Sequence, residues 1–91
     1  MPCRLLFTES YNRRARRLLK RHPELTKQYE KTLELLQLNP GHSSLRLHRL
    51  KGRLQDLHSV SINVTYRITL EFLIDGKTII PIDIGTHDEV Y

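Results

Sequence analysis

Histidine, arginine and tyrosine side chains in the second half of the chain are the groups best suited to chemistry. His48, Arg67, His87 and Tyr91 combine groups that can exchange protons with a cation that can hold a phosphate. Cleavage of RNA by protein groups alone requires a base for the 2′-hydroxyl, an acid for the departing 5′-oxygen and a cation at the phosphate. The same side chains also suit ordinary surface or core positions, so residue type alone leaves both interpretations open.

The other candidate groups have simpler interpretations. Arg49, Lys51 and Arg53 closely follow His48 and suit phosphate electrostatics better than proton transfer. His58 alternates in phase with apolar neighbours, which favours a packed histidine at the start of a strand. The sequence has no phosphate-binding glycine loop or nucleophile elbow. With one cysteine, and histidines that are not spaced as zinc ligands, we expect no disulfide, metal or other cofactor.

The first forty residues predict a short strand followed by a helical hairpin. The apolar run 3–7 indicates a strand, and Thr8 can cap the helix that follows. Pro23 separates two helices, because the residue before a proline is pushed out of the helical conformation and proline suits a first helical position. Apolar side chains recur at helical spacing in both segments: Tyr11, Ala15, Leu18 and Leu19, then Leu25, Tyr29, Leu33 and Leu36.

A change of period from 3.6 to 2 marks the start of the sheet. Over residues 58–72, apolar and polar side chains alternate, as is typical of strands with one buried face. The run is too long for one ordinary strand, so a turn is expected near residues 63–65. The polar set would then line an open, concave face that includes Ser59, Ser61 and Arg67.

The last strand is predicted over residues 78–84. An Asp-Gly pair at 75–76 is a strong hairpin signal, and Gly85 is expected to end the strand. Pro81 implies an edge position or locally unpaired backbone, because proline has no N–H. His48 is expected in the loop that enters the sheet.

Together these elements predict a single α+β domain covering residues 1–91, in the order β-α-α-β-β-β. Ninety-one residues can build one thin core but not two. The helical hairpin would cover one face of a small, mostly antiparallel sheet. The sequence has no stretch suited to a membrane span and its N-terminus does not resemble a signal peptide, so we expect a cytoplasmic location.

Charge is distributed unevenly along the chain, whose formal net charge is +5. Residues 1–31 carry nine basic and three acidic side chains, whereas residues 68–91 carry one basic and five acidic ones. A polarised cation of this kind suits a polyanionic partner, either nucleic acid or an acidic protein. A solvated basic helix without a ligand is the alternative.

Four motifs follow one another in order: His-Pro-Glu-Leu at 22–25, Leu-His-Arg-Leu-Lys-Gly at 47–52, Tyr-Arg-Ile at 66–68 and Ile-Gly-Thr-His-Asp-Glu-Val-Tyr at 84–91. Together they resemble the RelE/ParE toxin superfamily, particularly its RelE and YafQ branches. The resemblance spans nearly the whole chain. The fold of that family, strand-helix-helix-three strands, agrees with the order predicted from periodicity.

The resemblance implies the toxin of a type II toxin–antitoxin pair, most often a metal-independent endoribonuclease that cuts translated mRNA on the ribosome. The implied partners are an acidic, partly disordered antitoxin that folds on binding and the mRNA itself, with the toxin alone monomeric. By the same resemblance, His48 is a catalytic histidine and Arg67 holds the scissile phosphate. His87 is a proton donor, and Tyr91 is a base or a stacking partner for a nucleotide.

The resemblance is incomplete on the predicted open face. Ser59 and Ser61 stand where RelE has lysines, and the second histidine and the aspartate of YafQ align with Ser61 and Thr65. Two alternatives therefore stay open. One is a ParE-like gyrase inhibitor without nuclease activity, and the other is a decayed toxin that retains only antitoxin binding.

Overall fold

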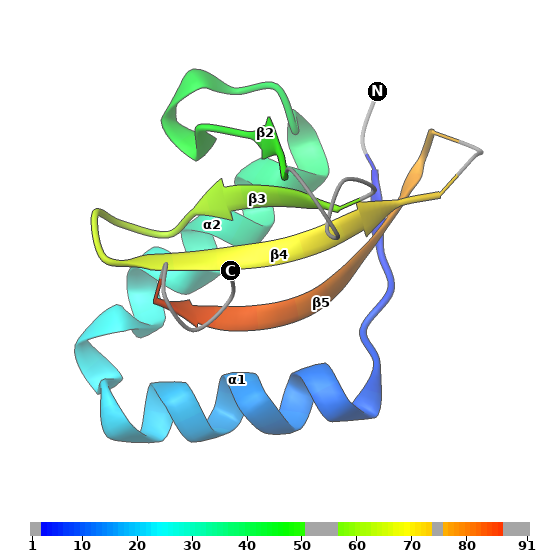
Figure 1. Ribbon diagram of the computed structural model, residues 1–91. Coiled ribbons are helices and arrows are strands. Elements are labelled where there is room, and N and C mark those ends of the chain that lie inside the picture. The colour runs from blue at the N-terminus through cyan, green and yellow to red at the C-terminus, as the bar shows by residue number, and fades with distance from the viewer. Residues whose placement is uncertain (1–2, 51–56, 74–75, 87–91) are drawn as a thin grey trace.

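The computed structural model describes residues 3–50, 57–73 and 76–86 and shows two helices packed against a five-stranded mixed sheet (Figure 1). The predicted α+β class and the predicted order of helices and strands are confirmed. The sheet order is β1-β5-β4-β3-β2, with β1 parallel to β5 and the other neighbours antiparallel. The elements are β1 (Arg4–Leu5), α1 (Glu9–Arg21), η1 (Pro23–Leu25), α2 (Thr26–Leu38), η2 (Ser43–Leu45), β2 (His48–Arg49), β3 (His58–Ser61), β4 (Tyr66–Phe72) and β5 (Thr78–Thr86).

Local side-chain chemistry sets the limits of the first helix. The Thr8 hydroxyl accepts a hydrogen bond from the Tyr11 backbone N–H at 3.2 Å, which satisfies one of the donors exposed at a helix N-terminus. His22 caps the other end, and Pro23 starts a short 3-10 turn that leads into α2. None of the described helices is long and apolar enough to cross a membrane.

The core lies between the two helices and one face of the sheet. Tyr11 on α1 is fully buried, and its hydroxyl hydrogen-bonds the hydroxyl of Tyr29 on α2 at 3.0 Å. Pairing the two hydroxyls removes the cost of burying either one alone. The remaining buried apolar members of this cluster are Ala15, Leu36, Leu45, Val60, Ile62, Ile68, Leu70, Ile79 and Ile84. The predicted apolar stripes therefore face the core.

The turn between β3 and β4 falls where the alternation predicts it. The Asn63 side chain accepts hydrogen bonds from the backbone N–H groups of Thr65 and Tyr66, each at 2.8 Å. Asparagine commonly closes turns in this way. Val64, which alternation alone would place on the buried face, lies in this turn and is 94% exposed.

Pro81 explains why β1 is so short. The Leu6 backbone N–H donates to the Ile79 carbonyl at 2.9 Å, and continuing the parallel ladder would require an N–H at residue 81, which proline lacks. Beside it, the pairing of β5 with β4 shifts by one residue, which leaves Ile82 as the additional residue of a bulge. The expectation that Gly85 ends the strand is wrong, because Gly85 pairs with Arg67 and β5 continues to Thr86.

The face of the sheet opposite the helices is less open than the sequence predicts. Ser59 and Thr69 are 0% and 2% exposed, and Ser61 is also buried. Their strands, β3 and β4, are interior strands with neighbours on both sides. Short side chains in such positions lie below longer ones, such as Arg67 and Glu71 on the same face. The hydroxyl groups on this face are therefore buried, and the charged side chains of Arg67 and Glu71 lie beside them.

Candidate functional site

The sheet register brings two of the predicted catalytic residues to one face. His48 pairs with Ser59, and Arg67 pairs with Ser61, two residues further along the same strand β3. Directly paired residues and residues two apart share a face, so His48 and Arg67 are on the same side. Two strand spacings and two residues of strand separate their Cα atoms by roughly 12 Å. His48 was expected in a loop, but it belongs to the two-residue strand β2, which forms against the edge of β3.

The backbone just before β2 orients the His48 ring. The Nδ1 atom of His48 lies 3.1 Å from the carbonyl oxygen of Arg46. A carbonyl only accepts, so Nδ1 must carry the proton, and the neutral ring then has its lone pair on Nε2. Arg46 itself adopts the left-handed conformation, with φ 50° and ψ 45°, which directs this carbonyl.

Arg67 has an unfilled hydrogen-bonding capacity. The side chain is half-buried, and within the part of the chain that the structure describes its Nη1 atom is buried without a hydrogen-bond partner. The hydroxyls of Ser59 and Thr69, on the same face, are also buried and unpaired there. Native structures leave few buried polar groups unsatisfied, so three on one face indicate either a binding function or stored strain.

His58 and Arg49 lie on the other face. Arg49 pairs with His58, and His58 pairs in turn with Leu70, whose side chain is fully buried in the core. The His58 ring packs edge-on against Phe72, with ring centroids 5.0 Å apart, as a packed histidine would. Burial lowers the pKa of His58, and the nearby charges of Arg49 and His48 lower it further. Arg49 therefore does not share the face of His48 and Arg67.

The four remaining predicted site residues, Lys51, Arg53, His87 and Tyr91, lie outside the described residues. Their roles stay predictions. Among residues 3–50, 57–73 and 76–86, no three His, Cys, Asp or Glu side chains are grouped so that they could hold a metal ion.

A contact that the sequence does not predict joins the helical hairpin to β4. The Tyr66 hydroxyl lies 3.2 Å from Nε2 of His22, and Nδ1 of His22 lies 3.7 Å from a Glu24 carboxylate oxygen. The His-Pro-Glu motif thus connects the junction of α1 and α2 to the residue that precedes Arg67. This position suits a structural role, in which the motif holds the helical hairpin against β4.

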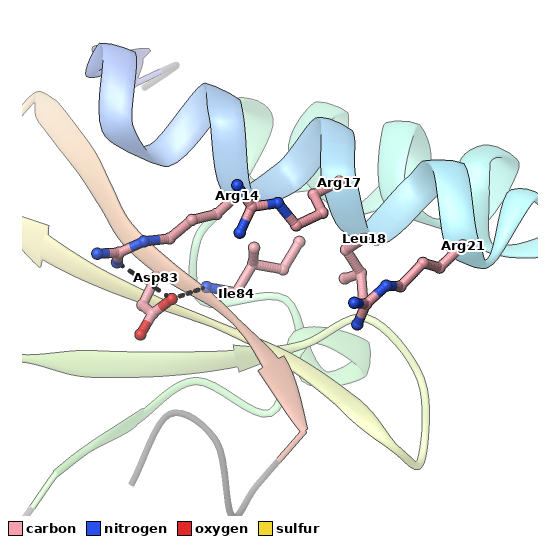
Figure 2. A pocket seen from close by; sticks show the side chains of 6 residues that line it. All are labelled: Arg14, Arg17, Leu18, Arg21, Asp83 and Ile84. Atoms are coloured by element: carbon pink, nitrogen blue, oxygen red, sulfur yellow. Dashed lines mark hydrogen bonds and ion pairs between the residues drawn. The ribbon is translucent and has the colours of Figure 1, made fainter.

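Two hollows were also missed by sequence reasoning. The larger, about 320 Å³, lies between α1 and β5 and is shown in Figure 2. The smaller, about 180 Å³, lies between η2 and the β3–β4 turn, and Ser61, the register partner of Arg67, is in its lining. The basic face of α1 is visible in the sequence, but the strand that completes the larger hollow is about seventy residues away.

Several solved structures have a closely similar fold. YafQ from E. coli strain BL21(DE3) superposes with a TM-score of 0.79 at 13% identity, covering 98% of each chain. The chain has the RelE/ParE toxin fold. A YoeB/ParE toxin from Agrobacterium tumefaciens gives a TM-score of 0.72 at 16% identity over 92% of this chain and 98% of that one. A chain of the toxin–antitoxin complex RelBE2 from Mycobacterium tuberculosis gives 0.64 at 17% identity, covering 96% of this chain and all of that one.

The likeness is one of structure. Neither a protein-family model nor a curated protein sequence matches this chain. At 13 to 17% identity these solved structures establish the fold of this chain, and its activity has to be argued from its own residues.

Proposed function

We propose that this chain is the toxin of a type II toxin–antitoxin system and cleaves mRNA on the ribosome with protein groups alone. One observation supports the proposal most directly: His48 shares a sheet face with Arg67, whose Nη1 atom is buried without a hydrogen-bond partner among the described residues. A buried N–H donor without a partner is well suited to an anionic oxygen that arrives with a substrate. The likeness to toxins of known structure supports this interpretation.

The proposed reaction is an internal transfer at phosphorus. His48 takes the proton of the 2′-hydroxyl at Nε2, and the 2′-oxygen forms a bond to phosphorus while the bond to the 5′-oxygen breaks. The departing oxygen must gain one proton, which His87 is proposed to give. Arg67 stabilises the extra negative charge on the phosphoryl oxygens during the transfer. The products are a 2′,3′-cyclic phosphate and a 5′-hydroxyl, with no atom gained or lost overall.

The surrounding groups have supporting roles in this proposal. Lys51 and Arg53 contribute positive charge near the RNA backbone, and Tyr91 acts as a base or stacks on a nucleotide. Arg49, which the register puts on the other face, would contact a phosphate beyond the scissile one. Phosphate contacts of this kind supply most of the sequence-independent affinity for RNA.

An acidic antitoxin is the proposed protein partner, and the toxin alone is proposed to be monomeric in the cytoplasm. The first 31 residues carry nine basic and three acidic side chains, which suits an acidic protein that covers this surface. The RelBE2 structure is itself a toxin–antitoxin complex.

Expression in cells followed by mapping of mRNA 5′ ends tests the proposal. The parent chain is expected to produce new ends within translated mRNA, and Arg67→Ala to reduce them strongly. Arg16→Ala, which removes an exposed arginine on α1, is the matched control and should cleave like the parent. The same cultures are scored for gyrase-dependent DNA breaks. Breaks with intact mRNA would establish gyrase inhibition instead, and neither effect would leave a decayed toxin that only binds its antitoxin.

A further inference from the structure

The hollow between α1 and β5 has a basic wall. Arg14, Arg17 and Arg21 line it, spaced three and four residues apart and therefore on one face of the helix (Figure 2). Arg14 is paired, since one of its nitrogens lies 3.4 Å from the Asp83 carboxylate. Arg17 and Arg21 have no partner among the described residues. Two guanidinium groups thus line a cavity in which the Asp83 carboxylate is already paired with Arg14.

The hollow also has an apolar surface and borders a strand edge. Leu18 of α1 and Ile84 of β5 form the apolar surface, as Figure 2 shows. Beyond Ile79 no strand of the described chain covers β5 on this side, because β1 pairs only with Thr78 and Ile79. The exposed edge is closed by side chains instead. Arg14 donates to the Ile82 carbonyl at 3.4 Å, and the Ile84 N–H donates to the Asp83 carboxylate at 2.8 Å.

From this arrangement we infer that the α1–β5 hollow is the docking site for an acidic segment of a partner protein that also carries aliphatic side chains. The inference rests on the proposed function, in which the partner is the antitoxin, and it says where on the toxin that partner binds. Arginine holds carboxylates through two parallel hydrogen bonds, and Arg17 and Arg21 are the groups placed to do so. Leu18 and Ile84 bury an aliphatic side chain of the same segment.

The chemistry of the hollow favours such a segment over an RNA strand. A phosphate gains nothing from the apolar surface of Leu18 and Ile84, whereas an aliphatic side chain is stabilised by burial against it. A peptide that alternates acidic and aliphatic side chains uses both the wall and the apolar surface. The hollow, at about 320 Å³, holds one or two side chains and not a whole helix, so the segment lies across the opening with a side chain inserted.

The docking site lies apart from His48 but close to Arg67. In the sheet order β5 and β2 are three strand spacings apart, which is roughly 14 Å. Arg67 on β4 pairs with Gly85, the neighbour of Ile84 in the hollow. A segment that occupies only this hollow therefore does not cover His48, and blocking His48 needs a further part of the partner.

Charge reversal on two faces of the same helix tests the inference. The probe is a fluorescein-labelled peptide, Gly-Glu-Leu-Glu-Glu-Leu-Glu-Gly, titrated with the full chain and followed by fluorescence anisotropy. Arg17→Glu with Arg21→Glu is expected to weaken binding at least 100-fold, about tenfold for each arginine–carboxylate pair that is removed. The matched control, Arg13→Glu with Arg16→Glu, changes the net charge equally outside the hollow and should change Kd less than threefold. Thermal unfolding checks the fold, and Arg17→Gln with Arg21→Gln replaces the first variant if it unfolds.

Two further probes identify the occupant. A peptide with serine in place of both leucines should bind at least tenfold more weakly than the first probe. Oligouridylate of matched charge should show no preference between the two double variants. Equal effects of both double variants on the acidic peptide would overturn the inference, and so would oligouridylate binding that is abolished only by the substitutions at Arg17 and Arg21.

The docking site and the nuclease activity can be tested independently of each other. Messenger RNA cleavage is measured with the same proteins, and both double variants keep His48 and Arg67. If the parent cleaves mRNA but peptide binding does not depend on Arg17 and Arg21, the docking site is refuted and the nuclease proposal stands. A parent that binds the peptide at Arg17 and Arg21 but cuts no mRNA refutes the nuclease and leaves the docking site.

Discussion

Replacement of Arg67 by methionine is expected to make the protein more stable and less active at once. The Arg67 Nη1 atom is buried without a partner in the described part of the chain. A buried donor left unsatisfied costs about 1 to 3 kcal/mol, and methionine keeps most of the aliphatic length while removing that donor. We expect the free energy of unfolding to rise by about 1 kcal/mol. In a domain of this size that corresponds to a Tm increase of roughly 4 to 8 °C.

The same substitution removes the proposed phosphate contact. A hydrogen bond to a charged group contributes about 1.5 to 3 kcal/mol, so cleavage should slow by roughly tenfold to 150-fold. Unfolding in urea and single-turnover cleavage of ribosome-bound mRNA measure the two effects on the same preparation. Arg16→Met on the exposed surface of α1 serves as the control and should change neither quantity. A methionine variant that is less stable than the parent and cleaves at the parental rate would identify Arg67 as a structural residue without a role in phosphate binding.

Three other predictions concern single side chains. His87→Ala should slow cleavage by at least about 100-fold without changing ribosome affinity, as measured by single-turnover kinetics and pelleting, if it transfers a proton. The pKa of His58 is lowered from 6.5 by burial, so below pH 6.5 the unfolded chain binds the proton first and stability should fall as pH falls. His58→Phe should remove that part of the pH dependence of urea unfolding; an unchanged slope would contradict it. Arg46→Gly should stabilise the fold by about 0.5 to 1 kcal/mol, because glycine adopts a φ of 50° without strain. Arg46→Val should destabilise the fold, and urea unfolding of both variants measures the two effects.

The helices and turns could be predicted from the sequence because their determinants are local. Thr8 caps its helix by accepting from an N–H three residues away, and Asn63 closes a turn within three residues. Strand limits depend on partners far along the chain and were predicted less well. The two-residue strand β2 has no signal of its own and exists because β3 offers it an edge. Gly85 continues its strand because Arg67 pairs with it.

The candidate site could be predicted only in part for the same reason. Alternation places Ser59 and Arg67 on one face of a strand pair, but it does not tell how deeply a short side chain lies between its neighbours. Ser59 is consequently buried where an open surface was expected. That His48 shares this face follows from the pairing of β2 with β3, which periodicity does not reveal. The α1–β5 hollow needs Asp83, which is distant in sequence from the arginines of α1.

The proposed cleavage of translated mRNA by His48 and Arg67 can be measured in a purified system. Purified parent chain and its His48→Ala variant are mixed with ribosomes programmed with a defined, end-labelled mRNA, and the cut ends are followed in a single turnover. We predict that the parent cuts the message to leave a 2′,3′-cyclic phosphate and that the variant is at least about 100-fold slower while binding ribosomes equally well. Cleavage at the parental rate by the variant, or an uncut message with the folded parent, would contradict the account.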